Sequence, residues 1–340
     1  MLPQLLEKRT VSVYQDVVVA GQTISTGRRD CKGRWQAIAP HFPTSGAVLD
    51  IGSNFGWFGL RACETSRRLV VASVEADEGS AAIQRHVLES HRHERIVLLT
   101  RRAGIAMARE FAAAGQRFEA VLCLSVLHWM PDHEPFLLAL GALSRKIFVE
   151  LPSPDEDGAG VSEIRRQIGE AGDYLQRLFP ERRRVRLAQT ASHRKASHPR
   201  EIWLAEQIGH PASHSPGLDV SALLRLSPSW PPQSWWRRQI DRVWLENTPD
   251  LGGARLVLSP DGVTWSPAQA GQAQPSLPRI KRQVAGLPET RLFSRRDWIA
   301  RRIRGIAKST KLPQLALKLR QVCRFNRRRE QRQVRFARAK

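Results

Sequence analysis

The sequence predicts a doubly wound α/β domain with a mostly parallel, Rossmann-like sheet, followed by a basic C-terminal extension. In the first half of the 340-residue chain, short and continuously apolar runs alternate with segments of helical periodicity. Strands that are apolar throughout are buried on both faces, and this requires helices on both sides of a parallel sheet. Basic residues are concentrated at the far end of the chain, and this separates the extension from the domain.

The alternation begins at residue 47 and continues for about a hundred residues. We expect strands at 47–51, 69–74, 96–99, 120–125 and 146–150. We expect helices between them at 57–65, 80–89, 103–114 and 134–143. After Pro152 the order changes to one long helix at 162–178 and then two strands at 184–189 and 201–205. Two successive strands favour an antiparallel edge hairpin, which would end the domain near residue 208.

The charge divides the chain into a nearly neutral body and a basic tail. Residues 279–340 hold 21 Lys and Arg against three acidic residues, a net charge of +18, whereas the other 278 residues carry only +4. Any argument about polyanions or membranes therefore applies to the tail. We expect four parts: an N-terminal cap segment (1–40), the α/β domain (41–208), a Pro-, Gly- and Trp-rich accessory region (209–278), and a partly helical basic tail (279–340). Within the accessory region, the run 254–267 predicts a hairpin around Pro-Asp-Gly.

Several classes of protein are disfavoured by composition. No apolar run reaches the roughly 18–20 residues that span a bilayer, and the first residues lack the pattern of a signal peptide, so we expect a cytoplasmic protein. The four cysteines are far apart and form no CxxC pair, which predicts neither a disulfide framework nor a zinc site. The histidines between residues 193 and 214 lack metal-ligand spacing, so we expect no metal centre.

The stretch VLDIGSNFG (48–56) is the first candidate for a ligand site. It runs from a predicted strand into a predicted helix, and Gly52, Asn54 and Gly56 suit a tight loop with positive φ whose N–H groups face a ligand. The spacing is neither the GxGxxG of a dinucleotide site nor a phosphate-binding P-loop. The next strand ends at Glu75, about where such folds place an acid that binds ribose hydroxyls.

Together with FEAVLCLSVLHW (118–129), these stretches resemble the class I S-adenosylmethionine-dependent methyltransferases over roughly residues 30–208. The resemblance implies that S-adenosyl-L-methionine (SAM) is the cofactor. The residues that it assigns to the cofactor are Arg34, Trp35, Asp50, Gly52, Ser53, Asn54, Gly56, Glu75 and Ser125. The chain departs from the family pattern at Asn54, which replaces a glycine, and at LLTRRAG, which lacks the acid that commonly binds adenine. Adenine recognition then falls to backbone N–H groups near Arg102 and Ala103.

Methyl transfer from a sulfonium is an in-line displacement, so positioning supplies most of the catalysis, and a base is needed only if the acceptor must lose a proton. Two residues are candidates for a catalytic role. His128 lies on the exit loop of the fourth strand, where packing against Trp129 is the alternative to acting as a base. Glu150 ends the fifth strand, where it could orient an acceptor or serve as a structural hydrogen-bond acceptor. No Asn/Asp-Pro-Pro-Tyr/Phe motif follows the fourth strand, which favours an oxygen acceptor over a base amine.

The sequence therefore predicts O-methylation of a glycan, a lipid-linked sugar or a small molecule. An RNA methyltransferase that uses the basic tail and a non-catalytic SAM-binding protein are the alternatives. In residues 294–340, helical periodicity places Trp298, Ile299 and Ile303 on one face opposite arginines, which suits an anionic membrane surface and a peripheral location. RNA is the second choice because the tail has few aromatic side chains to stack on bases. A solvated tail without a partner remains open as well.

Overall fold

The computed structural model describes most of residues 13–208 and some short later stretches. These residues are 13–19, 21–91, 93–152, 161–191, 199–208, 217–219, 223, 226, 228–230, 255–259 and 262–266. The chain divides into two units, 1–290 and 291–340, and every described residue belongs to the first unit. The amphipathic segments expected at 294–340 lie outside the described residues.

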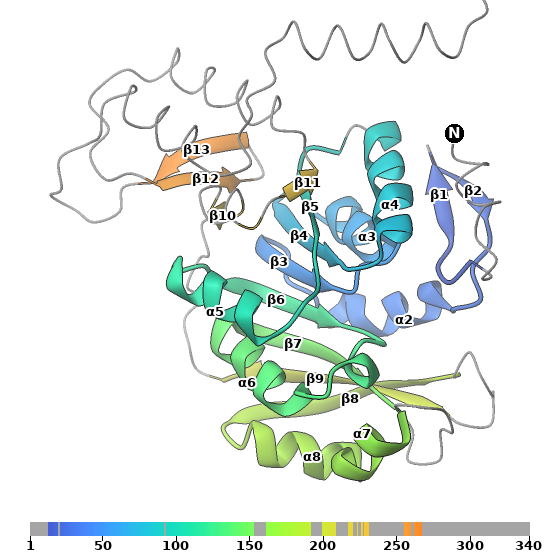
Figure 1. The fold of residues 1–340 in the computed structure, drawn as a ribbon, viewed down its shortest axis with the longest axis vertical. Coiled ribbons are helices and arrows are strands. Elements are labelled where there is room, and N and C mark those ends of the chain that lie inside the picture. Colours follow the sequence, from blue (N-terminus) through green and yellow to red (C-terminus); the bar gives the residue numbers. More distant parts are fainter. Residues whose placement is uncertain are drawn as a thin grey trace, which may run out of the picture. The chain divides into compact units, whose positions relative to one another are not determined.

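An eight-stranded sheet forms the centre of the first unit, in the order β11-β5-β4-β3-β6-β7-β9-β8 (Figure 1). Its parallel strands are β3 (Gly46–Ile51), β4 (Leu69–Glu75), β5 (Ile96–Thr100), β6 (Phe118–Cys123) and β7 (Ser144–Leu151). At one edge β9 (Arg200–Gln207) runs antiparallel to both β7 and β8 (Arg182–Thr190). The predicted doubly wound fold and its edge hairpin are confirmed.

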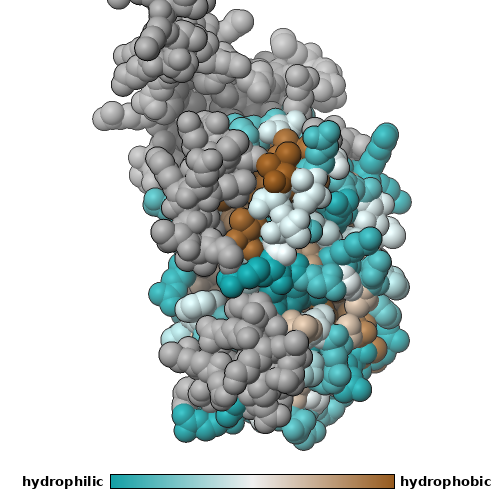
Figure 2. Space-filling view, turned by 90° about the vertical axis from the view of Figure 1, so that its right-hand side faces the viewer, coloured by the Kyte–Doolittle hydropathy of each residue, from teal (hydrophilic) through white to brown (hydrophobic). Residues whose placement is uncertain are grey.

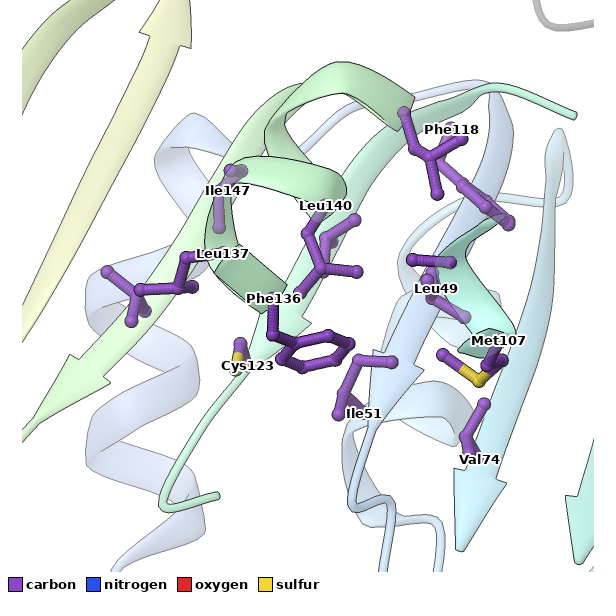
Figure 3. Close-up of a cluster of buried hydrophobic side chains, with 14 of the residues drawn as sticks. Leu49, Ile51, Val74, Met107, Phe118, Cys123, Phe136, Leu137, Leu140 and Ile147 are labelled. Carbon is purple, nitrogen blue, oxygen red and sulfur yellow. The ribbon is translucent and has the colours of Figure 1, made fainter. Parts of the chain in front are cut away.

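Helices cover both faces of this sheet. They are α2 (Cys31–Ile38), α3 (Trp57–Thr65), α4 (Glu78–His91), α5 (Ile105–Ala113), α6 (His133–Leu143), α7 (Val161–Ile168) and α8 (Ala171–Leu178), with short 3₁₀ turns η1 (Ala39–His41) and η2 (Leu127–Trp129). Successive residues of β3 enter different cores, because side chains alternate along a strand. Val48 packs with residues of α3 and α4. Leu49 and Ile51 pack in the other cluster, where Figure 3 shows them with Phe136 and Leu140 of α6.

The single helix expected at 162–178 is wrong, because the structure has two helices there. Helix α7 ends at Ile168 and α8 begins at Ala171. Gly169 between them has φ +61°, a left-handed conformation that stops a helix and that glycine adopts without strain. Its N–H still donates to the Arg165 carbonyl at 2.8 Å, as at a helix end.

The main sheet includes one strand beyond residue 208, the expected end of the domain. Strand β11 (Pro228–Trp230) pairs antiparallel with β5 and so extends the main sheet. The indole N–H of Trp230 also donates to the His93 carbonyl at 3.1 Å. The predicted hairpin in this region is confirmed as β12 (Arg255–Ser259) and β13 (Gly262–Ser266), which form a small sheet with β10 (Leu218–Asp219).

The N-terminal segment forms a small hairpin of β1 (Val17–Val19) and β2 (Gln22–Ser25) beside α4 (Figure 1). The ring Nε2 of His91 lies 3.1 Å from the Val18 carbonyl oxygen, which joins the hairpin to that helix.

Over the part of the chain that the structure describes, no helix has the length and apolarity needed to cross a membrane. Figure 2 shows a mainly hydrophilic face with small, separate hydrophobic areas.

Candidate functional site

A cavity of about 1020 Å³ lies at the carboxyl ends of the parallel strands. Its walls come from the loops after β3, β4, β5 and β6, from the end of β7, and from the N-terminal segment that includes residues 14–34. Ligands of open α/β sheets bind at this edge, beside the point where strand order reverses. In this sheet β3 is the reversal point, because its neighbours are β4 on one side and β6 on the other.

The loop from β3 to α3 is a tight turn built from residues with positive φ. Gly52 has φ +67°, Asn54 has φ +53° and Gly56 has φ +81°. A Cβ at Gly52 would lie only 2.5 Å from Cγ2 of Val126, and one at Gly56 would lie 2.6 Å from the amide nitrogen of Gln84. Gly52 and Asn54 line the cavity. Gly52 therefore lets this loop approach the loop after β6, and Gly56 lets it approach α4.

Glu75 lies at the end of β4 and links the loop after β3 to the loop after β4. Its Oε2 accepts a hydrogen bond from the Asn54 N–H at 2.7 Å, and its Oε1 accepts one from the Asp77 N–H at 2.7 Å. Burial raises the pKa of this carboxyl. Each carboxylate oxygen has a second lone pair, so Glu75 can accept two more hydrogen bonds from a ligand in the cavity.

Asp50 lies beside Glu75 on β3 and is buried, with 3% of its surface exposed. Burial, and secondarily the nearby charge of Glu75, raise its pKa to about 7. Its Oδ2 has no hydrogen-bond partner among the described residues, although Asp50 lines the cavity. A buried carboxyl in this state is suited to a ligand that brings a positive charge or a hydrogen-bond donor.

Three of the predicted cofactor residues do not line the cavity, and their contact with a cofactor stays a prediction. Trp35 is not among the residues that line the cavity, because its ring packs against Phe42 with 5.0 Å between centroids. The Ser53 hydroxyl also points away, since it donates to Oε1 of Gln84 at 2.8 Å and the residue is 1% exposed. Gly56 does not line the cavity either and is instead the N-cap of α3.

Glu150 lies at the centre of a buried cluster of charges at the β7 side of the cavity. Arg29 Nη2 donates to its two oxygens at 2.9 and 3.2 Å. Arg34 donates to Oε1 from Nε at 3.0 Å and from Nη2 at 2.7 Å. The hydroxyls of Thr190, at 2.9 Å, and Ser125 donate to the same carboxylate. The predicted cofactor residue Arg34 therefore lines the cavity, but its guanidinium is bound to Glu150.

This environment argues against an acid–base role for Glu150. Burial alone would raise its pKa, but Arg34, Arg29 and Arg200 together lower it to about 2. A carboxylate that remains ionised well below neutral pH is a poor proton acceptor for a reaction near pH 7. The carboxylate holds two arginines in place, and a role for Glu150 in orienting an acceptor stays a prediction.

Ser125 and His128 lie on the loop after β6, as expected. Ser125 has φ +57°, unusual for a residue other than glycine, and its hydroxyl accepts hydrogen bonds from Arg29 at 2.7 Å and Arg200 at 3.2 Å. His128, in η2, is half-buried and lines the cavity. Its ring lies 5.0 Å from that of Trp129, which is 67% exposed. The catalytic role of His128 stays a prediction.

Arg102 and Ala103 line the same cavity beyond β5, where adenine recognition is expected.

Sequence reasoning missed several residues that come from distant parts of the chain. Gln15 accepts hydrogen bonds from the N–H groups of Phe55 at 3.2 Å and Trp57 at 3.4 Å, so it caps the loop that starts α3. A single sequence does not show which distant residues gather around one acid, and so Arg29, Thr190 and Arg200 were missed. The density of arginine in the stretch GRRDCKGRW, which lies over the strand ends, was the one available signal. Among the described residues, no cluster of His, Cys, Asp and Glu is arranged to hold a metal ion.

Comparisons with protein-family models and with curated protein sequences give no match. Among solved structures, the chain is similar to WbdD crystallised with the kinase inhibitor LY294002, with a TM-score of 0.50 and 16% identity over 61% of this chain and 47% of that one. Another structure describes WbdD as a bifunctional kinase-methyltransferase, with a TM-score of 0.50 and 16% identity over 61% of this chain and 46% of that one. The N-terminal domain of EvdMO1 with SAH bound gives a TM-score of 0.44 and 17% identity over 61% of this chain and 94% of that one. The chain thus spans less than half the length of WbdD, and at this identity the likeness shows the fold.

Proposed function

We propose that this protein is a SAM-dependent methyltransferase that acts on an oxygen of a glycan, a lipid-linked sugar or a small molecule. One observation carries the proposal: Gly52, Asn54, Asp50 and Glu75 converge on one cavity at the reversal point of a methyltransferase-like sheet. WbdD, whose fold is similar, is described as a kinase-methyltransferase, and this supports the reaction class.

The residues present fit the cofactor that the resemblance implies. Gly52 lines the cavity at a point with no room for a side chain, because a Cβ there would lie 2.5 Å from Cγ2 of Val126. Asp50 Oδ2 and Asn54 Oδ1 are buried atoms without a hydrogen-bond partner among the described residues. Glu75 would accept hydrogen bonds from the ribose hydroxyls, and Asp50 would face the positively charged methionine end.

SAM, when bound, supplies a methyl group made electrophilic by its sulfonium. The chain's own contribution is to hold the acceptor in line beside Ser125 and His128, and to exclude water with the N-terminal segment that includes Gln15 and Arg29. An imidazole nitrogen of His128 would take the proton from the acceptor hydroxyl.

Titration calorimetry with S-adenosylhomocysteine (SAH) tests the cofactor assignment. We expect wild-type protein to bind SAH, and Glu75→Gln to bind it at least about tenfold more weakly, because charge-assisted hydrogen bonds to the ribose are lost. Glu89→Gln is the matched control, since Glu89 is exposed on α4 and does not line the cavity. Absence of SAH binding by the wild type would refute the assignment.

Turnover separates an enzyme from a binding protein of the same fold. Transfer of a labelled methyl group from SAM to sugars, lipid-linked sugars or small hydroxyl compounds would support the proposal. Transfer to RNA alone would favour the RNA alternative. Tight SAH binding with no transfer to any acceptor would favour a non-catalytic binding protein.

We propose that the basic tail holds the protein at an anionic membrane surface. Its net charge of +18 and its predicted apolar face lead us to expect that the full chain sediments with anionic liposomes. Trp298→Glu should weaken that association, because it places a charge on the face that would be buried in the membrane. RNA binding with a steep salt dependence, and no liposome binding, would contradict the membrane proposal.

A further inference from the structure

The ends of β3 and β4 give the cavity an acidic part, and the end of β7 lies beside a basic part; Arg101 and Arg102 line it as well, beyond β5. Asp50, Glu75 and Asp77 line it at the ends of β3 and β4. At the β7 side it is lined by Arg29, Arg34 and a single carboxylate, Glu150, and Arg28, next to Arg29 in the chain, lines the cavity too. Because β3 lies between β4 and β6, and β6 lies between β3 and β7, the two parts are separated along the strand ends. We name the second part, Arg28, Arg29, Arg34 and Glu150, the basic end.

The basic end contains more positive charge than Glu150 offsets. Arg29 and Arg34 are each 3% exposed and both donate to Glu150, so one carboxylate serves two buried guanidiniums. The Nε of Arg29 is buried with no hydrogen-bond partner among the described residues. A charge removed from water is costly unless an opposite charge lies near it, so this end of the cavity favours a ligand that brings an anion.

Arg28 provides a cation that such a ligand can reach. It lines the cavity, is exposed, and makes no ion pair or side-chain hydrogen bond with any described residue. Its backbone N–H donates to the Val13 carbonyl at 3.0 Å, which fixes the main chain from which its side chain extends. A guanidinium can bind a phosphate or a carboxylate through two parallel hydrogen bonds.

We propose that the methyl acceptor carries an anionic group, a phosphate or a carboxylate, and that Arg28 and Arg29 bind this group at the basic end of the cavity. The inference rests on the proposed function and narrows its substrate class. The acidic part suits the cationic cofactor, whereas the basic end adjoins Ser125 and His128, where the acceptor would lie. An acceptor with an anion beside its reacting hydroxyl complements this division of charge.

The cofactor's own methionine carboxylate is a second source of the same chemistry. Comparing the binding of SAH with that of 5′-methylthioadenosine, which lacks that carboxylate, tests whether the basic end binds the cofactor. If the basic end bound the cofactor, loss of Arg28 would weaken SAH and leave 5′-methylthioadenosine unchanged.

The experiment uses the full chain saturated with SAH and titrates it with inorganic phosphate and, separately, with acetate. Arg28→Gln is compared with Arg67→Gln, an exposed arginine that does not line the cavity, so that any anion binding by the tail is common to both proteins. We expect Arg28→Gln to weaken the tighter of the two probes about fivefold or more, with SAH affinity unchanged. We expect Arg67→Gln to behave as wild type.

The inference would be overturned if Arg28→Gln and Arg67→Gln bound phosphate and acetate equally well. It would also be overturned if Arg28→Gln bound SAH more weakly but bound 5′-methylthioadenosine as the wild type does. Phosphate as the tighter probe would indicate a phosphorylated acceptor, and acetate a carboxylated one. Absence of SAH binding would instead refute the proposed function, and the same titrations of the ligand-free protein would still test the basic end.

Discussion

Replacing Glu150 by glutamine tests whether the buried charge cluster stabilises the folded protein. The substitution keeps the shape of the side chain but removes the negative charge, while Arg29 and Arg34 stay buried within 2.7–3.2 Å of it. Breaking a buried ion pair by removing one partner costs about 3–5 kcal/mol, because the remaining charge is left without compensation. The pKa of Glu150 falls from its ordinary 4.5 to about 2, which corresponds to roughly 3 kcal/mol of stabilisation.

The pH dependence follows from the same pKa. The folded-state pKa lies below the unfolded one, so the stabilisation is fully present above about pH 4.5 and is lost as the pH falls toward about 2. Urea unfolding followed by circular dichroism should therefore show a free-energy difference between wild type and Glu150→Gln that shrinks over that range.

Glu134→Gln is the matched control for this experiment. Glu134 also binds one arginine through two hydrogen bonds, with Arg177 at 2.7 and 3.2 Å, but the two side chains are 32% and 56% exposed. Water screens this pair, so its loss should cost far less. A loss below about 1 kcal/mol in Glu150→Gln, or a loss that does not change with pH, would refute the reasoning.

Three further predictions concern the cavity. SAM affinity should fall as the pH drops below about 7, because Asp50 must release a proton to face a cation; calorimetry with Asp50→Asn should show this dependence lost. Gly52→Ala should lower the free energy of unfolding in urea by about 1–3 kcal/mol and weaken SAH binding, because the new Cβ meets Val126. Gly169→Ala is the control: Gly169 has φ +61° and no atom within 4 Å of the new Cβ, so the loss of stability should be smaller and SAH affinity unchanged. His128→Ala should lower turnover about 10²-fold or more in a methyl-transfer assay with SAH affinity unchanged; an unaltered rate would assign His128 to packing.

Local patterns were sufficient to predict the order of the central elements. The helix expected at 57–65 is α3 (Trp57–Thr65), and the strand expected at 47–51 is β3 (Gly46–Ile51). Pattern reading succeeds here because both elements are rich in apolar residues that the fold buries. The pattern failed at Gly169, where the periodicity of α7 continues into α8 and only the backbone conformation of one residue separates them.

Most of the cavity wall at the ends of β3 and β4 could also be predicted from the sequence. Gly52, Asn54 and Glu75 follow directly after apolar strands, and parallel strands bring their carboxyl ends to one edge. Trp35 could not be placed in this way, because a helix turns each side chain by about 100° and a single sequence does not show which face packs on Phe42.

The sequence by itself determined the α/β alternation, and with it the edge of the sheet at which the cavity lies, because both depend on residues close together in the chain. Only the tertiary structure decided the charge cluster around Glu150 and the pairing of β11 with β5. Arg29 and Arg34 lie 121 and 116 positions from Glu150. Such contacts depend on which strands become neighbours and how the N-terminal segment crosses their ends, and no local pattern of residues contains that information.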